Sequence, residues 1–512
     1  MSMGITLSVY SDVTLHGLFT DHMVLQREMP VAVYGKAAPG EKIIVTFAGQ
    51  EKTAITDKTG KWGVKLDALK ASTNAATLSI AGKNKLTLSD VVVGDVWVCA
   101  GQSNMEYLLG NCGRPDDVKD ANYPLLRQFN VPHNFAGWRQ TDVKGNWVSC
   151  TPQTAGNFTA VGYYFSRKIY RETGVPIGLI RCVSSGTSIE PFCSAEGLAS
   201  VSELAEDKNR IDMQMAEYRS NVSNALSKIE TYVADARKAL ATNAELPDTV
   251  KIAGGPATGP CAWHCVYNGM ICPLVNFGIK GALFYQGETN GSEEARYYHK
   301  MRALITGWRK AWSQGDFPFY FVQLPNYSNP DNKPEGGDGW AKTRMGQFKA
   351  LSITNTGMAV TIELANVGNP GDVHPQNKRD VGERLALWAL AKNFGKNDLV
   401  YSGPLYRAMN IEDNKIRIAF DNIGSGLIVA TKKGYNPMVK DQQGKLQRFA
   451  IAGDNKKWFW ADAVIDGKTI VVSSPDVPRP TAVRYAYSVN PDGCNLYNNE
   501  GLPASPFRTD DW

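Results

Sequence analysis

One serine lies where a strongly apolar stretch of the sequence ends. The run Val96–Ala100 leads directly into Gly101, Gln102 and Ser103, and hydrophobic residues resume after Asn104. A serine hydroxyl attacks a carbonyl carbon efficiently only when an imidazole takes its proton and fixed donors hold the oxyanion that forms. A hydroxyl at the mouth of a buried strand, beside a glycine and two amides, therefore predicts acyl transfer chemistry.

Of the six histidines, His374 is the best placed to act as the base. It lies in the segment NPGDVHPQNK, between a predicted strand and a predicted helix, two positions after Asp372. The Asp372 carboxylate would fix the tautomer of the imidazole and support its charge. Taken alone, the segment is more typical of a helix N-terminal turn with a capping aspartate. Together with Ser103, it predicts a catalytic base.

Three groups near strand ends are candidate donors to the oxyanion. They are the backbone N–H of Ser103, the backbone N–H of Gly186 in SSGTSIE, and the side-chain amide of Gln286 in YQGETNG. Alone, Gln286 would as readily satisfy local backbone groups. We expect Glu288 and Asn290, in the same loop, to orient substrate hydroxyls or to hold the loops together.

The nine cysteines are an odd number, so at least one is unpaired within the chain. One cluster combines cysteines with a histidine and has the residue types of a zinc site: Cys261, His264, Cys265 and Cys272. Its spacing matches no common zinc motif. We therefore expect buried structural cysteines, with a disulfide among them as an alternative, and no metal or cofactor, with zinc as the alternative.

The pattern of elements divides the chain into three parts. Residues 1–92 and 396–512 contain short alternating runs separated by turn residues, which are typical of antiparallel β modules. Between them, residues 93–395 alternate apolar strands with amphipathic helices, which predicts an α/β domain with a mostly parallel sheet. Within it, 196–250 is a helical insertion that we expect to cover a core rather than to wall the cleft.

This organisation would gather the chemical groups. In an open parallel sheet, ligands bind outside the carboxyl ends of the strands, where several loops converge. Ser103, Gly186, Gln286 and His374 all follow predicted strands of the α/β domain. We therefore expect these four loop ends to meet in one site.

Composition excludes several classes of protein. The chain has 55 Lys and Arg against 50 Asp and Glu, an excess too small for a nucleic-acid-binding surface. No stretch of about 18 apolar residues is present, so we expect no membrane-spanning helix. The opening MSMGITLSVYSD lacks the charged start and long apolar stretch of an intact signal peptide.

Five motifs in the order AGQSNM, SSGTSIE, YQGETNG, GDFPFYFVQLPN and DVHPQNKRDVGERLA resemble those of the sialate O-acetylesterase family of SGNH-type hydrolases. The resemblance extends to LFTDHMVLQREMPVAVYGKAAPGE near the start and NLYNNEGLPASPFRTDDW at the end, and so covers almost the whole chain. It implies a flavodoxin-like α/β/α hydrolase domain flanked by β-sandwich modules, which removes acetyl groups from carbohydrate hydroxyls without a metal.

Carried over by position, the resemblance assigns the nucleophile to Ser103, the base to His374, and oxyanion donors to Gly186 and Gln286. The spacing between the proposed triad acid and the histidine differs from that in many members of the family. Many SGNH enzymes place the acid three positions before the histidine, whereas Asp372 precedes His374 by two. Glu363 and a Ser-His dyad are therefore alternatives to Asp372. The segment SSGTSIE also lacks the tryptophan and second glycine that related sequences often carry.

Three functions fit these observations. The first is a sialate O-acetylesterase, which converts 9-O-acetyl sialic acid to sialic acid and acetate; the second is an acetylxylan or other plant-polysaccharide acetylesterase. A non-catalytic glycan-binding protein is the alternative of another class. We expect an O-acetylated sugar or glycan as the partner, no nucleic acid, and a secreted or periplasmic location, with a cytoplasmic one as the alternative.

Overall fold

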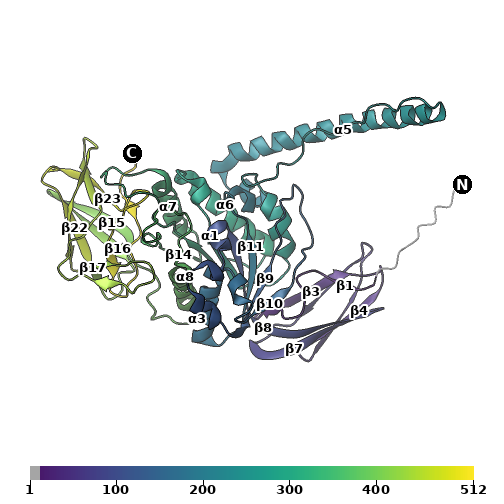
Figure 1. Cartoon of the computed structure of the whole chain (residues 1–512), viewed down its shortest axis with the longest axis horizontal. Helices are drawn as coiled ribbons and strands as arrows, with labels where there is room; N and C mark the ends of the chain where they lie inside the picture. Colours follow the sequence, from purple (N-terminus) through teal and green to yellow (C-terminus); the bar gives the residue numbers. More distant parts are fainter. Residues whose placement is uncertain (1–11) are drawn as a thin grey trace.

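The computed structural model describes residues 12–512, so the first eleven residues of the expected N-terminal module lie outside the described part. Figure 1 shows a β part, a central α/β part and a second β part in sequence order, with helix α5 standing away from the body. The fold class predicted from the sequence, α/β with flanking all-β parts, is confirmed.

The first β part consists of two packed groups of strands. One is a three-stranded sheet in the order β1-β3-β6, formed by β1 (Thr14–Leu15), β3 (Val31–Lys36) and β6 (Lys61–Leu66). The other contains β2 (Val24–Gln26), β4 (Lys42–Phe47), β5 (Gln50–Ile55), β7 (Ser72–Ala81) and the first half of β8 (Lys85–Gly101).

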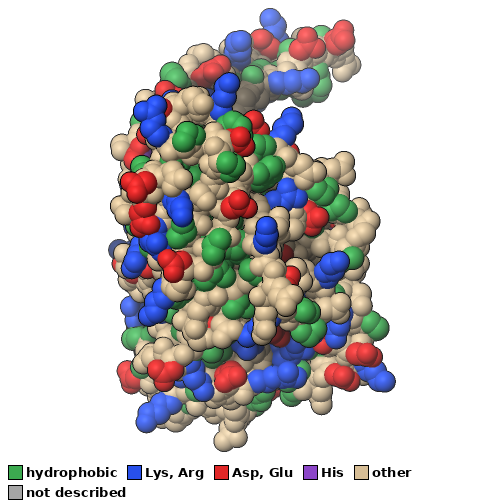
Figure 2. Space-filling model, turned by 90° about the vertical axis from the view of Figure 1, so that its left-hand side faces the viewer, with side chains coloured by type: hydrophobic (Ala, Val, Ile, Leu, Met, Phe, Trp, Pro, Cys, Tyr) green, Lys and Arg blue, Asp and Glu red, His purple; other side chains and the backbone are tan. Residues whose placement is uncertain are grey.

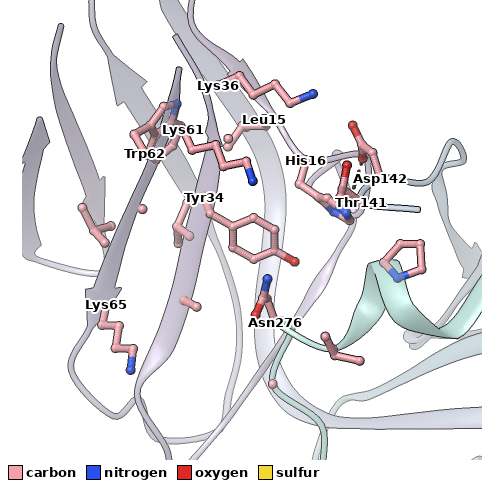
Figure 3. A pocket seen from close by; sticks show the side chains of 18 of the residues that line it. Leu15, His16, Tyr34, Lys36, Lys61, Trp62, Lys65, Thr141, Asp142 and Asn276 are labelled. Atoms are coloured by element: carbon pink, nitrogen blue, oxygen red, sulfur yellow. Dashed lines mark ion pairs between the residues drawn. The ribbon is translucent and has the colours of Figure 1, made fainter. Parts of the chain in front are cut away.

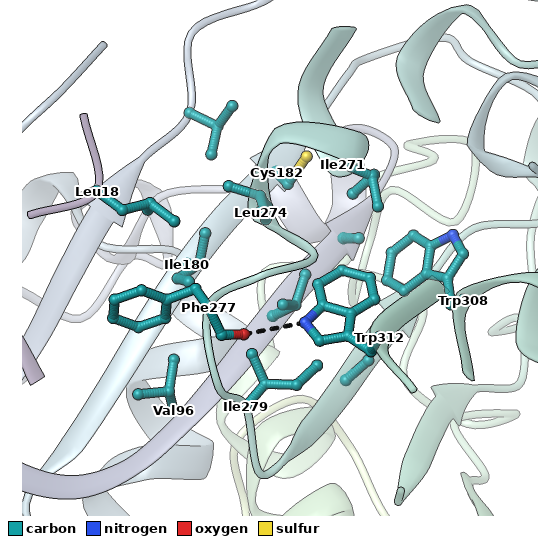
Figure 4. Packing of buried hydrophobic residues seen from close by; sticks show 14 of the residues in the cluster. Leu18, Val96, Ile180, Cys182, Ile271, Leu274, Phe277, Ile279, Trp308 and Trp312 are labelled. Carbon is teal, nitrogen blue, oxygen red and sulfur yellow. Dashed lines mark hydrogen bonds between the residues drawn. The ribbon is translucent and has the colours of Figure 1, made fainter. Parts of the chain in front are cut away.

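Strand β8 runs through both of the first two parts. It has 17 residues, pairs with β7 over its first half, and enters the central sheet with its second half. The boundary expected between residues 92 and 93 therefore lies inside one strand. The hydrophobic core is also continuous there, because Leu18, Val96 and Phe277 belong to one buried cluster (Figure 4).

The central sheet has the strand order β10-β9-β11-β8-β12-β13-β14 and is parallel except for the β9–β10 pair. Without β9 and β10, which the sequence did not predict, the order is that of a flavodoxin-like sheet, 2-1-3-4-5. The strands are β9 (Tyr123–Asn130), β10 (Trp147–Cys150), β11 (Ile177–Val183), β12 (Gly281–Tyr285), β13 (Phe319–Val322) and β14 (Thr356–Ala359).

Helices cover both faces of this sheet. Alternate side chains of a strand point to opposite faces, so Trp97 packs in one core with α3 and α8, and Val98 packs in another with α6. The α/β/α layering expected from the sequence follows from this alternation. The helices outside the insertion are α1 (Ser103–Glu106), α2 (Pro115–Lys119), α3 (Ala160–Thr173), α6 (Ala295–Trp312), α7 (Gly339–Lys349) and α8 (Lys378–Asn393).

Only the first residues of the helical insertion cover a core, because Leu198, Val201 and Leu204 are buried in the same cluster as Val96; for most of the long helix that follows, the expectation was wrong. The insertion contains the short α4 (Ala195–Ala199) and then α5 (Ala205–Ala241), a 37-residue helix of which only three residues are buried. Figure 1 shows α5 projecting from the body. Large apolar residues of α5, among them Leu226, Val233 and Leu240, are exposed.

The second β part contains three small sheets whose neighbouring strands are all antiparallel. On the face shown in Figure 2, Lys and Arg are interspersed with Asp and Glu. The strands are β15 (Leu405–Glu412), β16 (Lys415–Asp421), β17 (Leu427–Thr431), β18 (Val439–Lys440), β19 (Phe449–Gly453), β20 (Trp458–Trp460), β21 (Asp462–Asp466), β22 (Thr469–Ser473), β23 (Pro480–Tyr485), β24 (Leu496–Asn498) and β25 (Phe507–Arg508).

The cysteine cluster forms neither a disulfide nor a zinc site in residues 12–512. All nine cysteines are free thiols. His264 Nδ1 lies 2.8 Å from the carbonyl oxygen of Cys193, and the Cys265 thiol donates to two backbone carbonyls. In the described chain, no group of three or more His, Cys, Asp or Glu side chains is arranged to hold a metal ion. Nor does any helix there have the length and apolarity needed to cross a membrane.

Candidate active site

Ser103 begins helix α1 immediately after β8, where the chain turns sharply against β12. Gly101 has a φ of 137°, and a Cβ atom there would lie 2.1 Å from the carbonyl oxygen of Tyr285, so the turn requires glycine. The next N–H, that of Gln102, donates to the same carbonyl at 3.0 Å. The turn holds Ser103 at the carboxyl edge of the sheet, partly exposed.

Asn104 ties this turn to the His374 loop. Its side-chain nitrogen donates to the carbonyl oxygen of Val373 at 2.9 Å and to Glu288 Oε1 at 2.5 Å. Asn104 and Val373 are the immediate chain neighbours of Ser103 and His374. Three loops that are far apart in the sequence are therefore joined by one buried amide.

A ring contact brings His374 to the serine face of α1. The Tyr107 N–H donates to the carbonyl oxygen of Ser103 at 2.8 Å, so Tyr107 lies one helical turn beyond Ser103 on the same face. The Tyr107 ring stacks on the His374 imidazole with the centroids 6.1 Å apart. The Asn104 and Tyr107 contacts place the His374 loop beside the turn that carries Ser103, and the pairing of the two side chains as nucleophile and base remains a prediction.

The His374 loop is organised around Asp372. The Asp372 carboxylate accepts the backbone N–H of His374 at 2.9 Å, and its Oδ1 lies 3.6 Å from His374 Nδ1. Asn366, which the sequence analysis did not identify, donates to Asp372 Oδ2 at 2.9 Å and to the carbonyl oxygen of His374 at 3.1 Å. The alternative acid, Glu363, instead forms a buried ion pair with Arg384.

The electrostatics favour a neutral imidazole. Burial, followed by the positive charge of Lys378, lowers the pKa of His374, whereas Asp372 acts in the opposite direction. An imidazole with a lowered pKa is unprotonated at neutral pH and can accept a proton.

Lys378 is a fully buried cation beneath the site. Its ammonium donates to Asn104 Oδ1 at 2.6 Å and to the carbonyl oxygen of Pro375 at 2.5 Å, and it lies 4.7 Å from the centroid of the Tyr107 ring. Burial lowers the pKa of Lys378 to about 7 and raises the pKa of Glu288. Asn104 therefore links Glu288 to Lys378, because its side-chain nitrogen donates to Glu288 and its side-chain oxygen accepts from Lys378.

Gln286 lies in an internal network and is buried. Its side-chain nitrogen donates to Asn290 Oδ1 at 2.8 Å, to Gln102 Oε1 at 3.1 Å and to the Thr187 carbonyl at 3.3 Å. The Tyr297 hydroxyl donates to Gln286 Oε1 at 2.9 Å. In this structure Gln286 links the loops after three strands.

Glu288 and Asn290 have contacts that fit the second of their two expected roles, holding the loops together. Asn290 is buried, and its side-chain nitrogen donates to Glu190 Oε2 at 3.1 Å. Its oxygen accepts the backbone N–H of Ile189 at 2.9 Å. Glu288 meets Asn104, and its second carboxylate oxygen is buried without a hydrogen-bond partner among residues 12–512.

Gly186 lies in an exposed turn after β11, with a φ of 66°. The residue before it, Ser185, donates to Glu106 Oε2 at 2.6 Å. Glu106 also lies 3.4 Å from Arg181 and 3.4 Å from His133. The Gly186 turn is thereby fastened to α1.

The sequence analysis missed the residues that act between loops. Asn104 and Glu106 lie beside Ser103 in the motif AGQSNMEY, where proximity to the serine was the available signal. Lys378 looked like an ordinary polar residue at a helix start, and nothing in its neighbourhood of the sequence indicates full burial.

Comparisons with known proteins identify the relatives of the chain. Residues 264–391 match the family described as carbohydrate esterase, sialic acid-specific acetylesterase. The chain is 28% identical to sialate O-acetylesterase of Rattus norvegicus over 95% of this chain and 92% of that protein. The human enzyme is also 28% identical, over 95% of this chain and 90% of that protein.

A solved structure extends the likeness to the whole fold. A carbohydrate acetylesterase from Xanthomonas citri has 36% sequence identity and a TM-score of 0.79, covering 98% of this chain and 100% of that one. Likeness at this level, over both complete chains, includes the flanking β parts as well as the central sheet. The chain therefore belongs to the carbohydrate acetylesterase family that includes the sialate O-acetylesterases, and it is a carboxylic ester hydrolase.

Proposed function

We propose that the protein is a serine esterase that removes O-acetyl groups from carbohydrates, with 9-O-acetyl sialic acid as the substrate. The observation that carries the proposal is the bond from Asn104 to Val373, which holds the serine turn against the histidine loop. The sialate O-acetylesterases among its relatives support the choice of sugar. Acetylated plant polysaccharide is the alternative substrate.

In the acylation step, His374 removes the proton from the Ser103 hydroxyl as its oxygen attacks the acetyl carbonyl. Asp372 stabilises the imidazolium that forms. The backbone N–H groups of Ser103 and Gly186 hold the oxyanion. Gln286 is the third proposed donor; its amide has two N–H groups for three acceptors, so serving the oxyanion would require it to give up one of its bonds to Asn290 and Gln102 as well as the weaker contact with Thr187.

In the second half of the reaction, the imidazolium protonates the departing sugar alcohol, which leaves an acetylated Ser103. Water then loses a proton to His374 and attacks the acyl carbon. Collapse of this second oxyanion releases acetate and restores the hydroxyl. The loop contacts of Glu288 and Asn290 keep the donors in place through both steps.

Replacement of the nucleophile tests the proposal. Ser103→Ala is expected to reduce release of 4-nitrophenol from 4-nitrophenyl acetate at least about 1000-fold, because no other hydroxyl takes its place. Ser220→Ala, on the exposed arm α5, is the matched control and should retain full activity. Full activity of Ser103→Ala would remove the assignment. An inactive wild-type protein that binds glycans would favour the non-catalytic alternative.

A comparison of substrates distinguishes a sialate O-acetylesterase from a plant-polysaccharide acetylesterase. Acetate release is measured from 9-O-acetyl sialic acid and from acetylated xylan under the same conditions. A higher kcat/KM on the sialic acid supports the proposal, and a higher value on xylan replaces it. Secreted or periplasmic location belongs to the same proposal, and fractionation of the producing cell tests it.

A further inference from the structure

A hollow lies at the opposite end of β12 from the candidate active site. Asn276 shortly precedes β12, whereas Gln286 directly follows it. The hollow has a volume of about 870 Å³ and lies between the sheet β1-β3-β6 and the α/β part (Figure 3). We call it the lysine cleft; the residues that line it include Tyr34, Lys36, Lys61, Lys65, Asp142 and Asn276.

Tyr34 provides an aromatic surface in the middle of the lysine cleft. Figure 3 shows its ring projecting between Lys61 and Asn276. Its cross-strand partner is Gly63, so no neighbouring side chain stands beside the ring on β6. The Tyr34 hydroxyl is enclosed and has no hydrogen-bond partner within residues 12–512. Because this hydroxyl is enclosed, an occupant of the cleft would meet the Tyr34 ring rather than the hydroxyl.

Two lysines face each other at the edge of this surface. Lys36 on β3 and Lys61 on β6 are direct cross-strand partners in an antiparallel pair. Like charges in this position repel. Neither ammonium forms an ion pair in the described chain, although the Asp57 carboxylate accepts the backbone N–H of Lys61 at 3.0 Å. Lys65 extends the same face of β6. An anion held between Lys36 and Lys61 would remove the repulsion.

The opposite wall contributes an amide and a single acid. Asn276 is exposed, and Figure 3 shows its side chain beside the Tyr34 hydroxyl. The Asp142 carboxylate is already engaged, because it accepts the Gly17 N–H at 2.8 Å and lies 3.3 Å from His16 Nε2. The free charge of the cleft is therefore positive and lies on the β3–β6 side.

We propose that the lysine cleft binds a carboxylate-bearing sugar of an acidic glycan, as a second carbohydrate site remote from Ser103. The carboxylate would lie between Lys36 and Lys61, the apolar face of the sugar ring against Tyr34, and a sugar hydroxyl at Asn276. This combination of an aromatic face, cations and an amide suits an acidic sugar better than a bare anion or a neutral sugar. The cleft would tether a long glycan while its acetyl groups are removed.

Calorimetric titration with sialyllactose tests the proposal, since this sugar carries a carboxylate and no acetyl ester. The double variant Lys36→Glu, Lys61→Glu is expected to bind at least tenfold more weakly than the wild type. The matched control is Lys42→Glu, Lys85→Glu, which reverses two exposed lysines of the same β part outside the cleft and should bind as the wild type does. Equal affinity of wild type and Lys36→Glu, Lys61→Glu would overturn the proposal, as would no binding by the wild type.

Two further ligands define the chemistry. Lactose lacks the carboxylate and should bind the wild type at least tenfold more weakly than sialyllactose. Sodium sulfate supplies an anion without a sugar and should also bind at least tenfold more weakly. Affinity equal to that of sialyllactose for either ligand would contradict an acidic-sugar site, by indicating a neutral-sugar or a plain anion site.

Two controls separate this proposal from the catalytic one. Turnover of 4-nitrophenyl acetate by Lys36→Glu, Lys61→Glu should equal that of the wild type, because the cleft lies at the other end of β12. If the charge reversals lower the Tm, Lys36→Gln with Lys61→Gln removes the charges without adding acids, and the same tenfold loss of sialyllactose affinity is expected. Unchanged affinity in that variant would overturn the proposal.

Discussion

The two ends of strand β12 differ in how their polar groups are satisfied. At the carboxyl end, Gln286 and its neighbours bond mainly to each other, and even the buried ammonium of Lys378 has two acceptors. At the amino end, Lys36 and Lys61 face each other, and neither ammonium forms an ion pair among the described residues; the Tyr34 hydroxyl there has no hydrogen-bond partner.

This difference separates two ways of preparing a surface for a ligand. Acyl transfer requires groups that are already in position, so the loops around Ser103 are fastened by hydrogen bonds to one another. A binding surface can leave charge and hydrogen-bonding capacity unused until the ligand supplies the partners. The carboxyl end should therefore be sensitive to loss of internal contacts, and the amino end to loss of charge.

Replacement of the proposed triad acid, compared with replacement of Glu363, should produce the largest effect. Asp372→Asn is expected to lower kcat about 10⁴-fold, because the amide no longer supports the imidazolium or its tautomer. Glu363→Gln should leave kcat within about threefold, since Glu363 pairs with Arg384, and should lower the Tm instead. Steady-state kinetics and thermal unfolding of both variants check this. A greater loss of kcat in Glu363→Gln would exchange the two roles, and nearly full activity of Asp372→Asn would indicate a Ser-His dyad.

Removal of the buried cation should have the next largest effect. Lys378→Met leaves Asn104 Oδ1 and the Pro375 carbonyl without their donor, which is expected to cost about 1–3 kcal/mol of unfolding free energy. It should also lower kcat by up to about 100-fold, because a small displacement of the serine turn is enough to do so. Denaturant unfolding and kinetics measure both. Lys392→Met, on the exposed side of α8, is the control.

The pH profile distinguishes misplacement from a change in charge. The lowered pKa of His374 places the acid limb of kcat/KM below about pH 6.5, with activity rising as the imidazole loses its proton. Lys378→Met removes a positive charge that disfavours the imidazolium, so the acid limb should move to higher pH. An unmoved limb would mean that Lys378 acts only through position.

Salt should produce the smallest effect, and only at the amino end. Between about 50 and 500 mM NaCl, sialyllactose affinity is expected to fall several-fold, because exposed charges in the lysine cleft are screened. Turnover of 4-nitrophenyl acetate should change less than twofold over the same range. Titration and kinetics in matched buffers provide both values, and equal salt dependence at the two ends would remove the distinction.

Much of the fold could be predicted because its signals are local. The alternation of apolar strands and amphipathic helices expected for residues 93–395 is present, and the strands that precede Ser103 and Gln286 are continuous apolar runs. The same reasoning failed for α5, since an apolar period predicts a helix but not what its face will meet. Strands β9 and β10 were not predicted, because their short apolar runs resemble those of an irregular segment.

The residues of the candidate site also include some that the sequence could predict and some that it could not. Ser103, Asp372 and His374 could be identified because each lies in a short segment whose residue types suggest its chemistry. Asn104 and Lys378 could not, because their roles depend on contacts with residues more than a hundred positions away. Burial of a lysine is a property of the assembled loops.

Strand β8 determines whether the first β part can be separated from the α/β part by truncation or by heating. Its 17 residues pair with β7 at one end and with β11 and β12 at the other, so the first β part is not a portable unit that can be cut away or grafted elsewhere. A break near residue 92 would sever a ladder of hydrogen bonds in mid-strand. Heating should therefore melt the two parts in a single cooperative step, and until then the spacing between Tyr34 and Ser103 is as constant as the sheet itself.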